Sequence, residues 1–129
     1  MYQVMLADDE PTALNLLQTI IEKKCEGFQV AGIAYNGQEA LEKMKSLHPD
    51  VLITDIQMPV MNGLDLIGKA KEEDSDLVSI VISGYQEFEY AKTAMRYGVT
   101  DYILKPIVPS ELCALLEKVK NRLDIRYYR

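Results

Sequence analysis

The chain has 129 residues, 48% of them hydrophobic and 26% charged, which suits one globular domain with a single core. Its formal net charge of −6 argues against direct binding of nucleic acid, and no apolar run approaches the roughly 20 residues of a membrane span. Two cysteines are too few for a disulfide scaffold. We therefore expect Cys25 and Cys113, which both fall in helical patterns, to be buried or half-buried free thiols.

The first half of the chain alternates short apolar runs with stretches at helical spacing. Residues 3–7 are apolar and predict a strand, and Pro11 after them fits the first turn of a helix that continues to about Lys24. Residues 28–34 predict the next strand. Asn36 and Glu39 then have the spacing of a capping box. The helix that follows has an apolar stripe made of Ala40, Leu41, Met44 and Leu47.

The second half continues the alternation. A β-branched run from Val51 predicts a third strand that ends at Asp55, and a helix is expected over residues 64–73. Residues 77–82 predict a fourth strand, which ends at Ser83, and residues 101–104 a fifth, followed by Lys105. A helix between these strands is marked by Phe88, Ala91, Ala94 and Met95. The last helix carries the apolar stripe Leu112, Leu115, Leu116, Val119 and Leu123.

Five strands alternating with five helices predict a parallel sheet that is covered on both faces. Right-handed crossovers leave few topologies, and we choose the flavodoxin-like, doubly wound (βα)5 fold with strand order 2-1-3-4-5. The first and third strands are then neighbours. This order brings Asp8, Asp9 and Asp55 together at one edge of the sheet, where open α/β sheets bind their ligands.

Three carboxylates at one edge repel one another, and a hard divalent cation would offset that repulsion. Mg²⁺ prefers oxygen ligands, whereas the histidine and cysteine ligands of zinc do not occur at these strand ends. A cation would also ease the approach of a phosphoryl group to an aspartate nucleophile. Lys105 and Ser83 have the chemistry to bind phosphoryl oxygens, and Gly84 leaves room for them.

Over essentially its whole length the chain resembles the receiver domain of two-component response regulators. The resemblance rests on Asp8-Asp9 after the first strand, on Asp55 in ITDIQMPVMNG, on Ser83 in VISGY, and on GVTDYILKP at residues 98–106. It implies that Asp55 is the phosphoacceptor. It implies further that Asp9, Asp55 and the main-chain carbonyl of Gln57 bind Mg²⁺, with Asp8 reaching the ion mostly through water.

The resemblance also implies a switching role for Ser83 and Tyr102, a phosphate contact for Lys105, and a cis bond before Pro106. The chain is then a phosphorylation-activated switch that a sensor histidine kinase phosphorylates. Such a domain is not an enzyme, apart from its own phosphoryl transfer and dephosphorylation. We expect it to be cytoplasmic, with no membrane partner, and to form a homodimer on phosphorylation through a face made by the last two helices and the fifth strand. The residues predicted to lie around this face carry both signs of charge: Lys92, Arg96, Asp101, Lys118 and Arg122.

Residues 83–107 are most similar to receivers joined to an AraC-type helix-turn-helix domain. We therefore expect residues 1–125 to be a receiver, residues 126–129 to begin a linker, and DNA to be reached only through an output domain that is absent from this chain. The alternative is a stand-alone receiver that acts by protein contact.

Three rival functions are weaker. A phosphohydrolase of the haloacid dehalogenase type would need an acid two residues after the nucleophile, where this chain has Gln57. A flavodoxin-like electron carrier would need a phosphate-binding loop after the first strand, where Asp8, Asp9 and Glu10 would repel phosphate. A bare interaction module would leave the acidic cluster unexplained.

Overall fold

The computed structural model describes residues 1–84, 89, 96 and 98–127. Its strands are β1 (Tyr2–Ala7), β2 (Phe28–Ala34), β3 (Val51–Asp55), β4 (Val78–Ser83) and β5 (Asp101–Leu104). Its helices are α1 (Pro11–Lys24), α2 (Gly37–Leu47), α3 (Gly63–Glu73) and α5 (Pro109–Tyr127). The helix predicted from Phe88 to Met95 falls largely outside the described residues.

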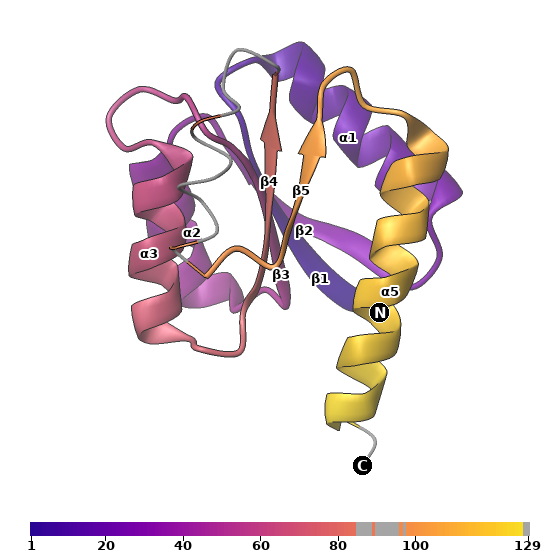
Figure 1. Ribbon diagram of the computed structural model, residues 1–129. Helices are drawn as coiled ribbons and strands as arrows, with labels where there is room; N and C mark the ends of the chain where they lie inside the picture. The colour runs from indigo at the N-terminus through magenta and orange to yellow at the C-terminus, as the bar shows by residue number, and fades with distance from the viewer. Residues whose placement is uncertain (85–88, 90–95, 97, 128–129) are drawn as a thin grey trace.

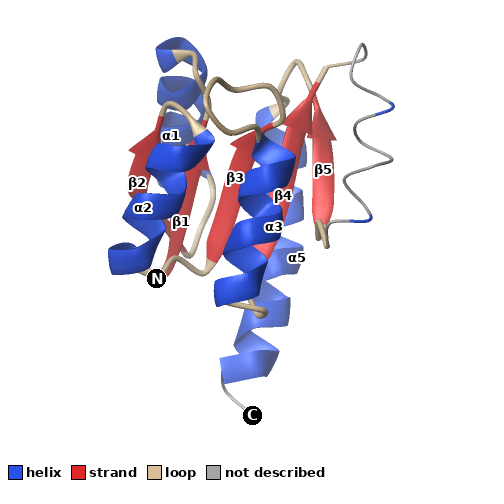
Figure 2. Cartoon of the chain, turned by 90° about the vertical axis from the view of Figure 1, so that its left-hand side faces the viewer, coloured by secondary structure: helices blue, strands red, loops and turns tan. Residues whose placement is uncertain are grey.

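Within the described residues, the strands form one parallel sheet in the order β2-β1-β3-β4-β5, which confirms the predicted fold. Helices α1 and α5 cover one face of this sheet, and α2 and α3 cover the other (Figure 1). The register pairs Ala7 with Thr54, and Asp55 with Ile82, so the carboxyl ends of the central strands lie at the same edge. That edge is the upper one in Figure 2.

Each face of the sheet has its own apolar core. Alternate strand residues such as Ile53, Ile80 and Ile82 pack with α1 and α5, while Leu52 and Val81 pack with α2 and α3. The central strands are buried on both faces, as expected for a parallel sheet.

The predicted helix starts depend on local chemistry that the structure reproduces. Pro11 occupies the first turn of α1, and the Asn36 side chain accepts a 2.8 Å hydrogen bond from the Glu39 N–H at the start of α2. Asn62 caps α3 in the same way, so this helix begins one residue earlier than predicted. Leu47 does not join the core: it is the last residue of α2 and is exposed.

The prediction of free thiols is wrong. Cys25 and Cys113 form a disulfide, with a Cα–Cα separation of 5.0 Å. Cys25 follows the end of α1, Cys113 lies near the start of α5, and these two helices pack on the same face of the sheet. Their pairing depends on tertiary packing, which composition and helical periodicity do not reveal. Among the described residues, no helix has both the length and the apolar character needed to cross a membrane.

Candidate functional site

Three carboxylates meet where β1 and β3 end. Asp8 and Asp9 follow β1, and Asp55 is the last residue of β3. One oxygen from each carboxylate lies within 4.8 Å of the others. Asp8 and Asp55 are buried while Asp9 is exposed, so the cluster is open to solvent on one side.

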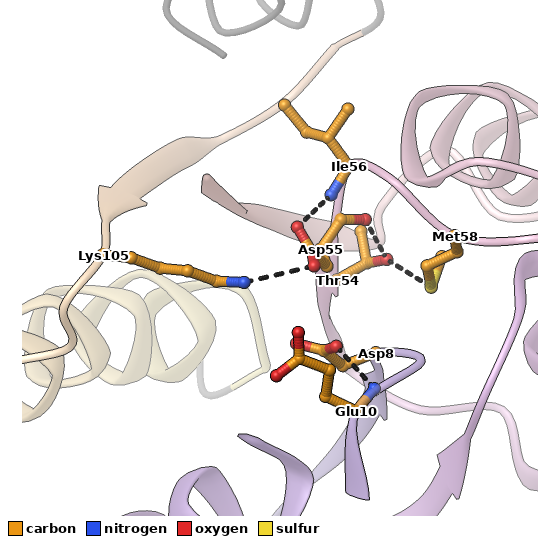
Figure 3. A network of polar contacts seen from close by, with 7 residues as sticks. All are labelled: Asp8, Glu10, Thr54, Asp55, Ile56, Met58 and Lys105. Atoms are coloured by element: carbon orange, nitrogen blue, oxygen red, sulfur yellow. Dashed lines mark hydrogen bonds and ion pairs between the residues drawn. The ribbon is translucent and has the colours of Figure 1, made fainter. Parts of the chain in front are cut away.

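Asp55 is held by one main-chain and one side-chain donor. Its Oδ1 accepts a 2.8 Å hydrogen bond from the Ile56 N–H, and its Oδ2 lies 3.2 Å from the Lys105 Nζ (Figure 3). Lys105 is itself fixed at its main chain, because its N–H donates to the Ser83 carbonyl at 2.8 Å. The bond between Lys105 and Pro106 is cis, as the resemblance implied.

Burial has a clear electrostatic effect at this site. Desolvation raises the pKa of Asp8 from 3.8 to about 6, although a hydrogen bond from the Glu10 N–H opposes that rise and the nearby Asp55 charge adds to it. For Lys105, partial burial lowers the pKa, but the attraction and hydrogen bond of Asp55 outweigh it and leave the pKa above its ordinary value. The ammonium group is therefore charged at neutral pH and faces an acidic cluster.

The loop after β3 is folded tightly against the site. The Gly63 N–H donates to the Ile56 carbonyl at 2.7 Å, and a Cβ on Gly63 would overlap the Asp55 carbonyl oxygen. That carbonyl also accepts a 2.8 Å hydrogen bond from the Thr54 hydroxyl. Thr54 and Gly63 thus position Asp55 through its main-chain carbonyl. Sequence reasoning did not single them out, although both lie in the ITDIQMPVMNG stretch.

Ser83 ends β4 beside the cluster and is fully buried. Its hydroxyl has no hydrogen-bond partner among the described residues. A buried donor without an acceptor costs free energy, so this position favours a ligand that brings an acceptor oxygen. Gly84 leaves open space beside it, since a Cβ built there would meet no atom within 4 Å.

Tyr102 is not a member of the carboxylate cluster. It is on β5, where the register pairs it with Val81 and pairs Leu104 with Ser83. Val81, the strand partner of Tyr102, lies two residues before Ser83. Because side chains alternate along a strand, Tyr102 and Ser83 therefore project from the same face of the sheet on neighbouring strands. The Tyr102 side chain is 40% exposed, so it lies at the rim of the domain.

The structure thus gathers Asp8, Asp9, Asp55 and Lys105, and it puts Ser83 at the neighbouring strand end. Gln57 follows Asp55 in the loop with an exposed side chain. Its predicted use of a main-chain carbonyl as a metal ligand stays a prediction.

Comparison with known proteins identifies relatives of this arrangement. Residues 4–117 match the family described as the response regulator receiver domain. Over 119 residues, 92% of the chain, it is 44% identical to the uncharacterized transcriptional regulatory protein YesN of Bacillus subtilis and 39% identical to the chemotaxis protein CheY of Thermotoga maritima. The chain spans 32% of the YesN protein and 98% of the CheY protein, and about half the length of other curated relatives.

Among solved structures, the fold is similar to that of the REC domain of AraT, a response regulator from Geobacillus stearothermophilus. The TM-score is 0.91 with 38% sequence identity, and the match covers 97% of each chain.

Proposed function

Since this chain belongs to the family of response regulator receiver domains, we propose that it is a phosphorylation-activated switch in which Asp55 accepts a phosphoryl group from a sensor histidine kinase. The observation that carries this proposal is the position of the Asp55 carboxylate. It lies 3.2 Å from the Lys105 ammonium and within 4.8 Å of two further carboxylates. This pairing of a nucleophile with a fixed cation suits transfer of an anionic group.

The acidic cluster fits Mg²⁺. Asp8, Asp9 and Asp55 supply hard oxygen ligands, and the exposed side of the cluster leaves room for the waters that this ion retains. The Gln57 carbonyl would complete the protein ligands. When bound, Mg²⁺ neutralises charge as the phosphoryl group approaches Asp55.

The remaining groups divide the work of binding the phosphoryl oxygens. The Asp55 carboxylate attacks phosphorus, and the kinase histidine leaves. The Lys105 ammonium then exchanges its contact with Asp55 for one with a phosphoryl oxygen. The hydrogen bond from the Lys105 N–H to the Ser83 carbonyl keeps the lysine main chain in place during this exchange. The buried Ser83 hydroxyl donates to another phosphoryl oxygen, which gives it the acceptor it lacks among the described residues.

Ser83 also links the site to the surface. Movement of its side chain toward the phosphoryl group frees space on the face of the sheet that it shares with Tyr102. A tyrosine is stable either packed inward or exposed at a rim, because its ring is apolar and its tip is polar. Tyr102 is therefore the bistable element that phosphorylation biases.

The surface that changes is the one beside Tyr102. A hollow between β5 and α5 is lined by both signs of charge, among them Asp101, Glu111 and Lys118, and Arg122 is exposed further along α5. A mixed patch of this kind suits a self-complementary, two-fold contact, so the phosphorylated domain forms a homodimer here. Lys92, also predicted for this face, lies outside the described residues.

The output is transcriptional control through a DNA-binding domain of the AraC type that would follow this domain in the cytoplasm. Similarity to the transcriptional regulatory protein YesN supports it. The alternative is a stand-alone receiver that acts by protein contact, and similarity to the chemotaxis protein CheY supports this alternative. Both use the same switch.

Phosphorylation by acetyl phosphate tests the proposal directly. With Mg²⁺, intact-mass spectrometry is expected to show one added phosphoryl group, and Asp55→Asn is expected to remove it. Asp65→Asn, which changes an exposed acid in the first turn of α3, is the matched control and should be labelled like the parent chain. Equal labelling of the Asp55→Asn chain would disprove the assignment.

A further inference from the structure

We propose that Cys25 and Cys113 form a reversible redox staple between α1 and α5, opened and closed by thiol–disulfide exchange with small thiols and disulfides. The two residues are 88 positions apart in sequence and 5.0 Å apart between Cα atoms, within the range that a disulfide requires. The proposal goes beyond the phosphorylation switch and does not depend on it.

Helix packing brings the two cysteines together. Cys25 caps α1, with its N–H donating to the Ile20 carbonyl at 3.2 Å, and Cys113 lies one turn into α5. Between them the two helices share one apolar core, to which α1 contributes Leu17 and Ile21. Because these core residues pack the two helices together, we expect the packing to remain when the bond is open, so that oxidation and reduction require no unfolding.

The two cysteines differ in access. Cys25 is only 8% exposed, whereas Cys113 is half-buried. Cys113 borders two surface hollows, one of about 290 Å³ shared with Cys25, Glu117 and Lys120, and one beside Pro109 and Ser110. Lys24 lines both hollows, and a cation favours the thiolate that carries out exchange, while Glu26 and Glu117 oppose it in the larger hollow but do not line the smaller one. Cys113 is therefore the sulfur that external reagents reach first.

The chemistry balances as two successive exchanges. To close the staple, the Cys113 thiolate attacks a small disulfide and releases one small thiolate, which leaves a mixed disulfide on Cys113. The Cys25 thiolate then attacks the Cys113 sulfur and releases the second small thiol. In total the protein dithiol loses two electrons and two protons, and one small disulfide becomes two thiols. Reduction reverses these steps, with a small thiolate attacking Cys113.

The staple acts on the element that follows the active-site lysine. Lys105 directly follows the last residue of β5, and α5 begins four residues later at Pro109. Closing the bond ties the start of α5 to the end of α1 and restricts the unfolded chain through a long loop. In a reducing compartment such as the cytoplasm proposed above, disulfides are usually transient or redox-sensing, and a pair in this position would give the domain an input besides phosphorylation.

Single-cysteine variants test the order of attack. When the folded Cys25→Ser variant is incubated with oxidised glutathione, it is expected to accumulate one glutathione on Cys113, because no second thiol resolves the adduct. Cys113→Ser is the matched control and should gain little, since Cys25 is nearly buried. The parent chain should show an internal disulfide and no adduct in intact-mass spectra. Equal labelling of the two single variants would overturn the assigned order.

Reversibility is tested on the parent chain. Dithiothreitol without denaturant should expose two titratable thiols and lower the melting temperature by roughly 10 °C. The double variant Cys25→Ser, Cys113→Ser should melt at the same temperature in both redox buffers. A parent chain that keeps two free thiols in oxidised glutathione, or a bond that dithiothreitol opens only in denaturant, would overturn the proposal. Acetyl phosphate labelling of both redox forms serves as a separate readout of Asp55.

Discussion

The buried carboxylate of Asp8 makes the metal-free domain less stable as pH rises. Its pKa is raised to about 6, so the folded state binds this proton more tightly than the unfolded chain, in which the pKa is near 3.8. Between these two values the folded protein holds more protons, and the free energy of unfolding therefore falls as pH increases. At about 1.36 kcal/mol per pKa unit, the loss approaches about 3 kcal/mol once pH exceeds 6.

Asp8→Asn is expected to remove this loss. In EDTA at pH 7.5 the variant should be more stable than the parent chain by up to about 3 kcal/mol, and the difference should shrink steadily as pH falls, toward zero below the unfolded-state pKa of 3.8, where Asp8 is protonated in both states. Urea denaturation from pH 4.5 to 7.5 measures the difference as a shift in midpoint. Asp65→Asn, at an exposed position on α3, is the control and should follow the parent curve.

Mg²⁺ supplies the second half of this test. At a hundredfold excess over its dissociation constant it should stabilise the parent chain by roughly 2.7 kcal/mol. Asp8→Asn should gain less, because it lacks one carboxylate of the cluster. The reasoning would be refuted if Asp8→Asn were no more stable than the parent chain at pH 7.5 in EDTA, or if its stability fell equally steeply with pH.

Three further predictions concern a strand, a loop and an interface. Ser79→Ala and Ser83→Ala each remove a buried hydroxyl without a partner among the described residues, so the free energy of unfolding of each variant should equal that of the parent chain or exceed it by up to about 1 kcal/mol. Only Ser83→Ala should lose the NMR shifts that phosphorylation causes along β5, and equal loss in both variants would contradict the coupling. Val60 has a φ of 69° and is 83% exposed, so Val60→Gly should raise the free energy of unfolding by up to about 1 kcal/mol, seen as a higher urea midpoint; a lower midpoint would argue against strain there. In sedimentation with beryllofluoride on Asp55 the chain should dimerise weakly, less so at high salt and in Arg122→Glu; a monomer at every accessible concentration would remove the dimer.

The features that sequence predicted well are set by local chemistry. Hydrophobic runs defined the strands, and the observed order is the one chosen from the few topologies that right-handed crossovers leave for alternating strands and helices. The cap at Asn36 and the start of α1 at Pro11 each depend on residues within one helical turn. The acidic cluster was predictable for a related reason: parallel strands end at one edge, so residues that follow neighbouring strands must meet.

The features that sequence missed depend on where distant elements meet. The pairing of Cys25 with Cys113 requires the end of α1 to lie against the start of α5. The final turns of α5 are a second case. There Asp124 accepts a hydrogen bond from the Tyr2 hydroxyl, and the Tyr127 ring stacks on that of Tyr2 at 6.1 Å between centroids. Neither contact has a signature in the spacing of residues along the chain.

Two energetic costs coincide at the edge of the sheet that carries the acidic cluster, and together they distinguish this edge from ordinary packing. Ser79 and Ser83 lie on the same strand, and neither hydroxyl has a partner among the described residues, so a missing partner alone does not mark a site. Ser83 differs because its carbonyl holds Lys105, and Lys105 in turn reaches Asp55. At the same edge, burial disfavours the charged form of Asp8. A cation and an anion that bind together would relieve both costs, since one neutralises carboxylates and the other accepts a hydrogen bond.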